Sequence, residues 1–214
     1  MKKNLISRVL ITFLIVTLIN VSKSDNPRPA PTSDTYQKID PKISTEDGRG
    51  INGDLTGYRL FDTNGNPANM DEMISKVKSA DVTFIGEIHT DTIAHNLEAM
   101  LLERTWDKWQ TLSLEMFETD VQYVLDEYMT GHINEEHFLK SARSWENYGS
   151  DYRKLIEFSK EKGSSVIAAN APRRYVNMVR RMGKNSLLNL PEEGKRFLPP
   201  LPVPDASSEY EKKF

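Results

Sequence analysis

Short apolar runs alternate with stretches of helical period along most of this chain. Three apolar runs predict buried strands, at 82–88, 111–117 and 165–170. Residues recurring every three or four positions predict helices at 69–79, 90–109, 121–129, 135–141, 151–161 and 173–182. A short strand at 58–61 and a turn at 62–66 precede them. Strands that alternate with helices are typical of an α/β fold with a mainly parallel sheet flanked by helices.

The two ends of the chain differ from this pattern. Basic residues followed by an apolar stretch up to Val21 predict an export signal over residues 1–24, with a retained membrane anchor as the alternative. Residues 25–56 are rich in proline and polar side chains and predict a flexible arm. An α/β domain is expected over 57–214, and because a further helix only begins near Ser207, we expect the sheet to be incomplete at the C-terminus.

Charge and cysteine content narrow the function classes. The predicted signal holds four basic and no acidic residues, so its removal moves the net charge from −3 to −7. An acidic protein is a poor electrostatic partner for nucleic acid, which we therefore exclude as a ligand. The chain has no cysteine, which rules out disulfides, thiolate metal sites and a lipoprotein anchor. We expect an exported protein, periplasmic or associated with a membrane.

Polar side chains stand where each predicted strand ends. Glu87 and His89 follow the first strand, Glu115 lies in the second, and Asn170 and Arg173 follow the third. Because parallel strands end at one edge of the sheet, these residues are expected to line one crevice. Glu115 favours a functional role, since a carboxylate in an apolar strand is costly to bury without a partner.

Other candidates lie on the predicted helices. His95 shares a helix face with apolar residues, which would place its imidazole over the strand ends. Histidines such as His89 and His95 can equally be half-buried groups bonded to the backbone. Trp145, Tyr148 and Tyr152 have core packing as their ordinary role, although a tyrosine can also supply a phenolate to haem iron.

Four motifs together resemble the ChaN-like haem-binding proteins, within a wider group that includes TraB/Tiki-like and erythromycin-esterase-like proteins. They are GEIH at 86–89 with His95 downstream, LSLEMFE at 112–118, tryptophan and tyrosine at Trp145 and Tyr152, and AANAPR at 168–173. The resemblance implies haem as cofactor, with a tyrosine on the iron, for which Tyr152 is the first candidate and Tyr148 the second. It also implies a homodimer in which a histidine of the partner subunit meets a haem propionate.

Three hypotheses follow. The first is an exported haem-binding protein rather than an enzyme, serving haem or iron acquisition or storage with an envelope haem-transport partner. Its haem site would draw on Glu87, His89, His95, Glu115, Trp145, Tyr148, Tyr152, Asn170 and Arg173. The second is a metal-dependent hydrolase of the TraB/Tiki or erythromycin-esterase-like type, which would use Glu87, His89 and Glu115. The third is an α/β domain whose site has decayed.

Overall fold

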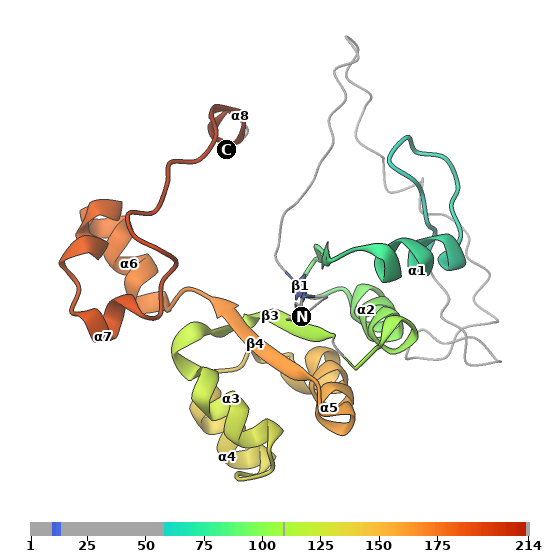
Figure 1. Cartoon of the computed structure of the whole chain (residues 1–214), viewed down its shortest axis with the longest axis horizontal. Coiled ribbons are helices and arrows are strands. Elements are labelled where there is room, and N and C mark those ends of the chain that lie inside the picture. The colour runs from blue at the N-terminus through green and yellow to red at the C-terminus, as the bar shows by residue number, and fades with distance from the viewer. Residues whose placement is uncertain (1–9, 14–57, 109, 213–214) are drawn as a thin grey trace, which may run out of the picture. The chain divides into compact units, whose positions relative to one another are not determined.

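The computed structural model describes residues 10–13, 58–108 and 110–212 (Figure 1). Its helices and strands alternate, and a small parallel sheet is flanked by helices, so the predicted α/β class is confirmed. The chain divides into two compact units. Unit 1 comprises residues 1–112 and 145–165, and unit 2 comprises residues 113–144 and 166–214. The predicted arm at 25–56 lies outside the described residues.

Unit 1 contains two strands that pair in parallel. In β1 (Leu10–Phe13) and β2 (Val82–Phe84), Leu10 lies opposite Val82 and Thr12 lies opposite Phe84. β1 lies within the predicted export signal, which itself stays a prediction. The strand predicted over 82–88 is shorter than expected, because its register with β1 ends at Phe84. Residues 85–88 are therefore a loop that leads to the next helix.

The helices of unit 1 begin at side-chain caps. The Asn69 side chain accepts a hydrogen bond from the Glu72 amide at the start of α1 (Met70–Ser79). Asp91 does the same at the start of α2 (Thr92–Thr105), where its Oδ1 accepts from the amides of the first turn. Such caps satisfy amides that have no partner within the helix. α2 ends at Thr105, four residues before the predicted end.

The strand predicted over 58–61 is wrong, whereas the turn after it is confirmed. Only one antiparallel bridge forms, between Phe61 and Pro67. The Asp62 carboxylate accepts the amides of Asn64 and Asn66 and closes the turn on itself. Side-chain capping of this kind closes a tight loop without a second paired strand.

A second helical stretch completes unit 1. A π-helical turn, η3 (Tyr148–Tyr152), runs directly into α5 (Arg153–Lys162). α5 ends at Gly163, whose φ of +64° is readily adopted by glycine. α2 packs against α1, η3 and α5. The core of this unit is formed by apolar side chains from α1, α2 and α5, namely Val77, Ala99, Leu101, Leu102, Leu155 and Ile156.

The strands β3 (Thr111–Glu118) and β4 (Ser165–Asn170) lie largely in unit 2, where they are neighbours in the sheet. The helices of unit 2 are α3 (Gln122–Met129), α4 (Glu135–Ala142), α6 (Arg173–Met182), α7 (Glu192–Lys195) and α8 (Ser208–Glu211). Short 3-10 turns, η2 (Thr119–Val121) and η4 (Lys184–Asn189), connect some of them. None of the described helices is both long and apolar enough to cross a membrane.

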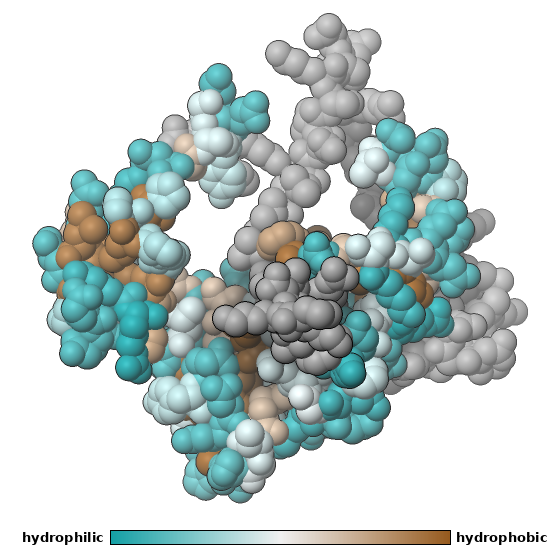
Figure 2. All heavy atoms as spheres, viewed as in Figure 1, coloured by the Kyte–Doolittle hydropathy of each residue, from teal (hydrophilic) through white to brown (hydrophobic). Residues whose placement is uncertain are grey.

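Part of the core of unit 2 is aromatic. The Phe138 ring lies 5.6 Å from Phe117 and stacks on Tyr128 at 4.4 Å between ring centroids. Stacked and tilted aromatic pairs of this kind add stability beyond the area that they bury. On the face shown in Figure 2, hydrophobic residues also gather over the α6 and η4 segment, where Val176, Met182 and Leu188 are exposed.

Candidate functional site

Glu87 is the centre of a polar cluster in unit 1. It lies in the loop after β2, and its side chain is only 10% exposed. One carboxylate oxygen, Oε2, forms an ion pair with His95 Nδ1 at 2.8 Å. The other, Oε1, lies 3.1 Å from His89 Nδ1 and accepts a hydrogen bond from the Tyr152 hydroxyl. One carboxylate therefore connects the loop to α2 and to η3.

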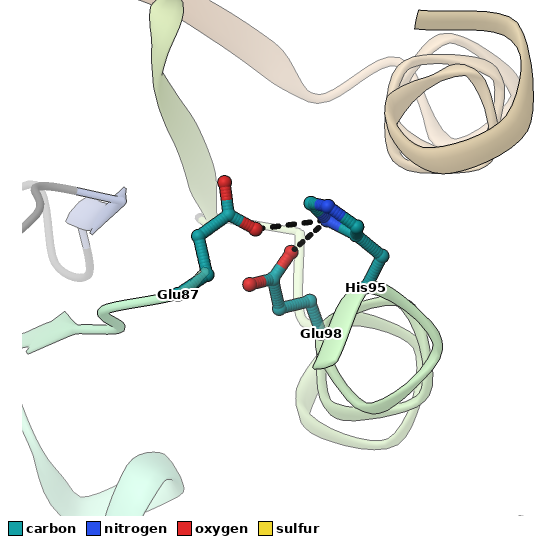
Figure 3. A group of neighbouring side chains, drawn as sticks. All are labelled: Glu87, His95 and Glu98. Atoms are coloured by element: carbon teal, nitrogen blue, oxygen red, sulfur yellow. Dashed lines mark hydrogen bonds and ion pairs between the residues drawn. The ribbon is translucent and has the colours of Figure 1, made fainter. Parts of the chain in front are cut away.

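His95 is fully buried, and both of its ring nitrogens face acceptors. Nδ1 lies between Glu87 and Glu98, 3.3 Å from Glu98 Oε2 (Figure 3). Nε2 lies 3.1 Å from the His89 carbonyl and 3.8 Å from Asp151 Oδ2. Burial would lower the pKa of His95, but the two carboxylates and the carbonyl raise it to about 10. The ring is therefore an imidazolium that donates from both nitrogens.

The two glutamates differ in their electrostatics. Burial would raise the pKa of Glu87, yet the contacts with His95 and Tyr152 lower it to about 2. For Glu98, burial is the dominant effect and raises the pKa to about 7, and the neighbouring Glu87 charge acts in the same direction. Burial and the Glu87 carboxylate also raise the pKa of Tyr152. The cluster thus holds Glu87 as an anion beside an imidazolium, and Glu98 close to its titration point.

His89 is the member of the cluster that reaches the surface. Its side chain is 41% exposed, whereas that of His95 is fully buried. The ring makes an edge contact with Trp145, with 4.3 Å between ring centroids. The His89 carbonyl accepts hydrogen bonds from His95 Nε2 and from Asn147 Nδ2, the latter at 2.7 Å. Both the backbone and the ring of this residue are therefore held in place.

The η3 turn supplies the aromatic side of the site. Tyr152 and Tyr148 are each only 3% exposed. The Tyr152 ring packs edge-on against His95, with 4.6 Å between centroids, and against Trp145 at 5.7 Å. Its hydroxyl is directed to Glu87, so that the phenol forms part of the buried cluster.

Three side chains have the arrangement of a possible cation site. Glu87, His95 and Glu98 each offer a ligand atom, and these atoms lie within 4.8 Å of one another. Within the described part of the chain, Glu98 Oε1 is buried without a hydrogen-bond donor, whereas Glu87 Oε2 is paired with His95 Nδ1. Two carboxylates and an imidazole suit a divalent cation, which would require His95 to lose its Nδ1 proton.

The predicted site residues fall into both units. Unit 1 brings together Glu87, His89, His95, Trp145 and Tyr152, and buries Tyr148 in the same turn. The remaining three, Glu115, Asn170 and Arg173, belong to unit 2. There, the Arg173 amide donates to Glu118 Oε2 at 3.1 Å. The predicted convergence of the three strand ends stays a prediction.

Sequence reasoning missed three members of the cluster: Glu98, Asn147 and Asp151. Glu98 could have been found, because it follows His95 by three residues and so shares its helix face. Asn147 donates to Asp151 Oδ2 at 2.8 Å, a contact across one turn of η3. The π-helical geometry of that turn left no recognisable period in the sequence.

The structure is thus that of an α/β protein in which a buried Glu–His–Glu cluster lies beside a partly exposed histidine, His89. The family model described as haem-binding uptake, Tiki superfamily, ChaN matches residues 73–214. The chain belongs to this family, as the four motifs predicted. Neither the curated proteins nor the solved structures contain a match to the chain.

Proposed function

We propose that this protein binds haem at the surface of unit 1 around His89. Family membership supports haem as the ligand class. The observation that carries the proposal is that the GEIH loop buries its carboxylate and exposes its imidazole, beside a tryptophan. A haem site needs an iron ligand and apolar contacts: the family resemblance implies a tyrosine as the ligand, and Trp145 and the 72% exposed Ile88 offer apolar surface.

The proposal extends to the setting in which haem would be bound. The basic and apolar N-terminal pattern supports export, and the family description supports a role in haem uptake. We therefore propose an exported protein of haem or iron acquisition or storage that forms a homodimer and exchanges haem with an envelope transport partner. Size-exclusion chromatography with and without hemin tests the dimer, and a single unchanged monomer peak would contradict it.

Titration of the purified full chain with hemin tests the function itself. We expect the Soret band to shift and to saturate at a fixed ratio of haem to protein. A shift that grows without saturation would contradict the proposal, because it indicates nonspecific adsorption. The Tyr152→Phe and Tyr148→Phe variants test the tyrosine ligand that the family resemblance implies, and a phenolate spectrum lost in one of them identifies that ligand.

The buried cluster supports a second candidate function, a metal-dependent hydrolase. The residues of this metal site differ from those predicted for the hydrolase. Glu87 is accompanied by His95 and Glu98, whereas Glu115 lies in unit 2. The buried Glu98 Oε1, which has no donor among the described residues, favours this reading, because a cation would satisfy it. The cation would supply a polarised water. Glu87, His95 and Glu98 would hold the cation in a buried site.

Calorimetric titration with Zn²⁺ and Mn²⁺ tests the second candidate. We expect stoichiometric binding that weakens in Glu98→Gln and is unchanged in Glu103→Gln, an exposed glutamate on the same helix. Ester and peptide hydrolysis would then depend on the added metal. Equal binding by both variants would contradict a site at this cluster.

A further inference from the structure

We propose that unit 2 docks on anionic phospholipid bilayers through a surface formed by α6 and η4. This basic apolar surface consists of Val176, Arg180, Arg181, Met182 and Leu188. It is independent of the proposed haem site, which lies in unit 1.

The first argument is the pattern of side chains on α6. Its apolar residues recur every three or four positions, at Tyr175, Val176, Met178, Val179 and Met182. A helix with such a stripe ordinarily packs it against a core, yet none of the ten residues of α6 is buried. Val176 is 53% exposed, Met182 is 65% exposed and Leu188 of η4 is 45% exposed, and hydrophobic residues gather there in Figure 2. Apolar side chains that gather in water beside polar ones mark an interaction site.

The second argument is the sign of the charge. Residues 173–190 include four arginines and one lysine but no acidic residue, in a chain whose net charge is −3. Arg174 and Lys184 are already paired, with Asp120 and Asp205. The other three arginines are exposed and form no ion pair with any described residue. Guanidinium groups bind phosphate oxygens through two parallel hydrogen bonds, so phospholipid headgroups suit them.

A bilayer fits this surface better than a second copy of the chain does. In a twofold dimer the same surface of both copies would meet, and two basic surfaces repel each other. A basic helix that leaves apolar side chains in water is instead typical of segments that lie in the interface of an anionic membrane. α6 has ten residues, which is too short to span the hydrocarbon core, so it would lie in the plane of the interface.

Contacts elsewhere on α6 hold it to the rest of unit 2. The Arg174 guanidinium stacks on the Tyr175 ring at 4.4 Å and pairs with Asp120 of η2. The Phe197 carbonyl, just after α7, accepts a hydrogen bond from Thr119 Oγ1 at 2.7 Å. None of these contacts uses Arg180 or Arg181. A docking element that is already fixed to a folded unit loses little conformational freedom on binding.

A fluorescent label on α6 tests the proposal, because the full chain has no cysteine. Met182→Cys carries an environment-sensitive dye, and Lys78→Cys, at an exposed position of α1, carries the same dye as the matched control. With vesicles of phosphatidylglycerol and phosphatidylcholine, we expect the emission at position 182 to shift to the blue and that at position 78 to stay unchanged. Vesicles of phosphatidylcholine alone should produce a much smaller shift, and added NaCl should reduce it, because salt screens the attraction.

A charge variant tests the part played by the arginines. In the chain labelled at position 182, Arg180→Gln with Arg181→Gln should lower the affinity for the anionic vesicles by more than about tenfold, because each basic side chain near such a surface adds to the attraction. Arg59→Gln with Arg104→Gln removes the same charge from exposed positions of unit 1 and is the matched control. Equal affinities of the two double variants would contradict the proposal.

The remaining outcomes also overturn the proposal. If the full chain sediments with the anionic vesicles while the emission at position 182 stays unchanged, another segment binds the lipid. If that emission shifts when the protein is concentrated without lipid, a second copy occupies the surface. If the chain does not bind the anionic vesicles at all, the surface has no affinity for them. Hemin titration is a separate measurement, so the haem-binding proposal stands or fails independently.

Discussion

At the scale of single residues, the buried cluster makes stability depend on pH in a defined direction. The pKa of His95 is raised from 6.5 to about 10, so the protonated ring stabilises the fold. This contribution is complete below pH 6.5 and is lost as pH rises through about 10. The pKa of Glu98, raised from 4.5 to about 7, means that the folded protein loses stability as pH rises between those values. The pKa of Glu87, lowered from 4.5 to about 2, stabilises the fold above pH 4.5, and this contribution is lost toward pH 2.

These three contributions predict a stability maximum near pH 4.5, where the contribution of Glu87 is complete and that of Glu98 begins to be lost. Thermal unfolding followed by circular dichroism should show a lower Tm at more acidic and at more alkaline pH. In Glu98→Gln, the slope between about pH 4.5 and about pH 7 should flatten, because the amide does not titrate. A Tm that rises steadily from pH 6.5 to pH 9 would contradict the protonated state of His95.

A second residue-scale prediction concerns the hydroxyl of Tyr152. Tyr152→Phe removes a hydrogen bond to an ionised carboxylate, and bonds of this kind contribute about 1.5 to 3 kcal/mol. We expect the free energy of unfolding in urea to fall by that order. Tyr123→Phe, at a side chain that is 62% exposed, is the matched control and should be near neutral. Equal effects of the two changes would contradict a stabilising hydrogen bond from the Tyr152 hydroxyl to Glu87.

At the scale of elements, α2 depends on its first turn, which carries His95. Asp91→Ala removes the oxygen that accepts the amides of Ile93 and Ala94, and should lower the free energy of unfolding by about 1 kcal/mol. The exposed Asp81, which precedes β2, provides the control Asp81→Ala. Hydrogen exchange of the α2 amides should accelerate only in Asp91→Ala, and protection equal to that of the unmodified protein would contradict the cap.

The edge of β4 provides another element-scale prediction. Gln122 Nε2 donates to the Val166 carbonyl at 2.9 Å, and the Ala168 amide donates to Gln122 Oε1 at 2.7 Å. This side chain therefore serves the strand as a substitute for a paired neighbour. Gln122→Ala should cost about 2 kcal/mol, from two lost hydrogen bonds, and speed exchange of the Ala168 amide. Glu127→Ala, on the exposed side of α3, should leave that exchange unchanged.

Elements with strong local signals were predicted from the sequence at their observed bounds. β4 and α6 begin and end where the apolar run and the helical period do. The strand predicted to continue to Ile88 did not, because its length depends on a partner strand that no local pattern reveals. η4 and α7 were missed, because segments of only six and four residues carry little periodicity.

Site prediction followed the same division between local and tertiary signals. Glu87 and His89 stood out because they follow a strand, and Trp145 and Tyr152 because of the family motif. Glu98 did not, since a glutamate on a helix is ordinarily a solvated residue and only the packing of His95 shows it to be buried. Which hydroxyl and which carbonyl meet the histidines is a tertiary property that spacing along the chain does not contain.

At the scale of the whole molecule, the cluster is assembled within unit 1 from two distant stretches, the 87–98 segment and the 145–152 segment. A ligand at His89 touches both, so its binding should stabilise the fold by mass action. With hemin at about one hundred times its Kd, the gain should be about 2.7 kcal/mol, seen as a higher Tm. His89→Ala should lose most of this gain.

Protoporphyrin IX without iron divides this stabilisation into its two physical sources. The metal-free ring would retain the apolar contacts with the surface around Ile88 and Trp145, but it offers no iron to a protein ligand. If the axial bond dominates, the metal-free ring should raise Tm far less than hemin. If both ligands raise Tm equally in the unmodified protein, apolar contact alone accounts for binding and the iron has no protein ligand at this site.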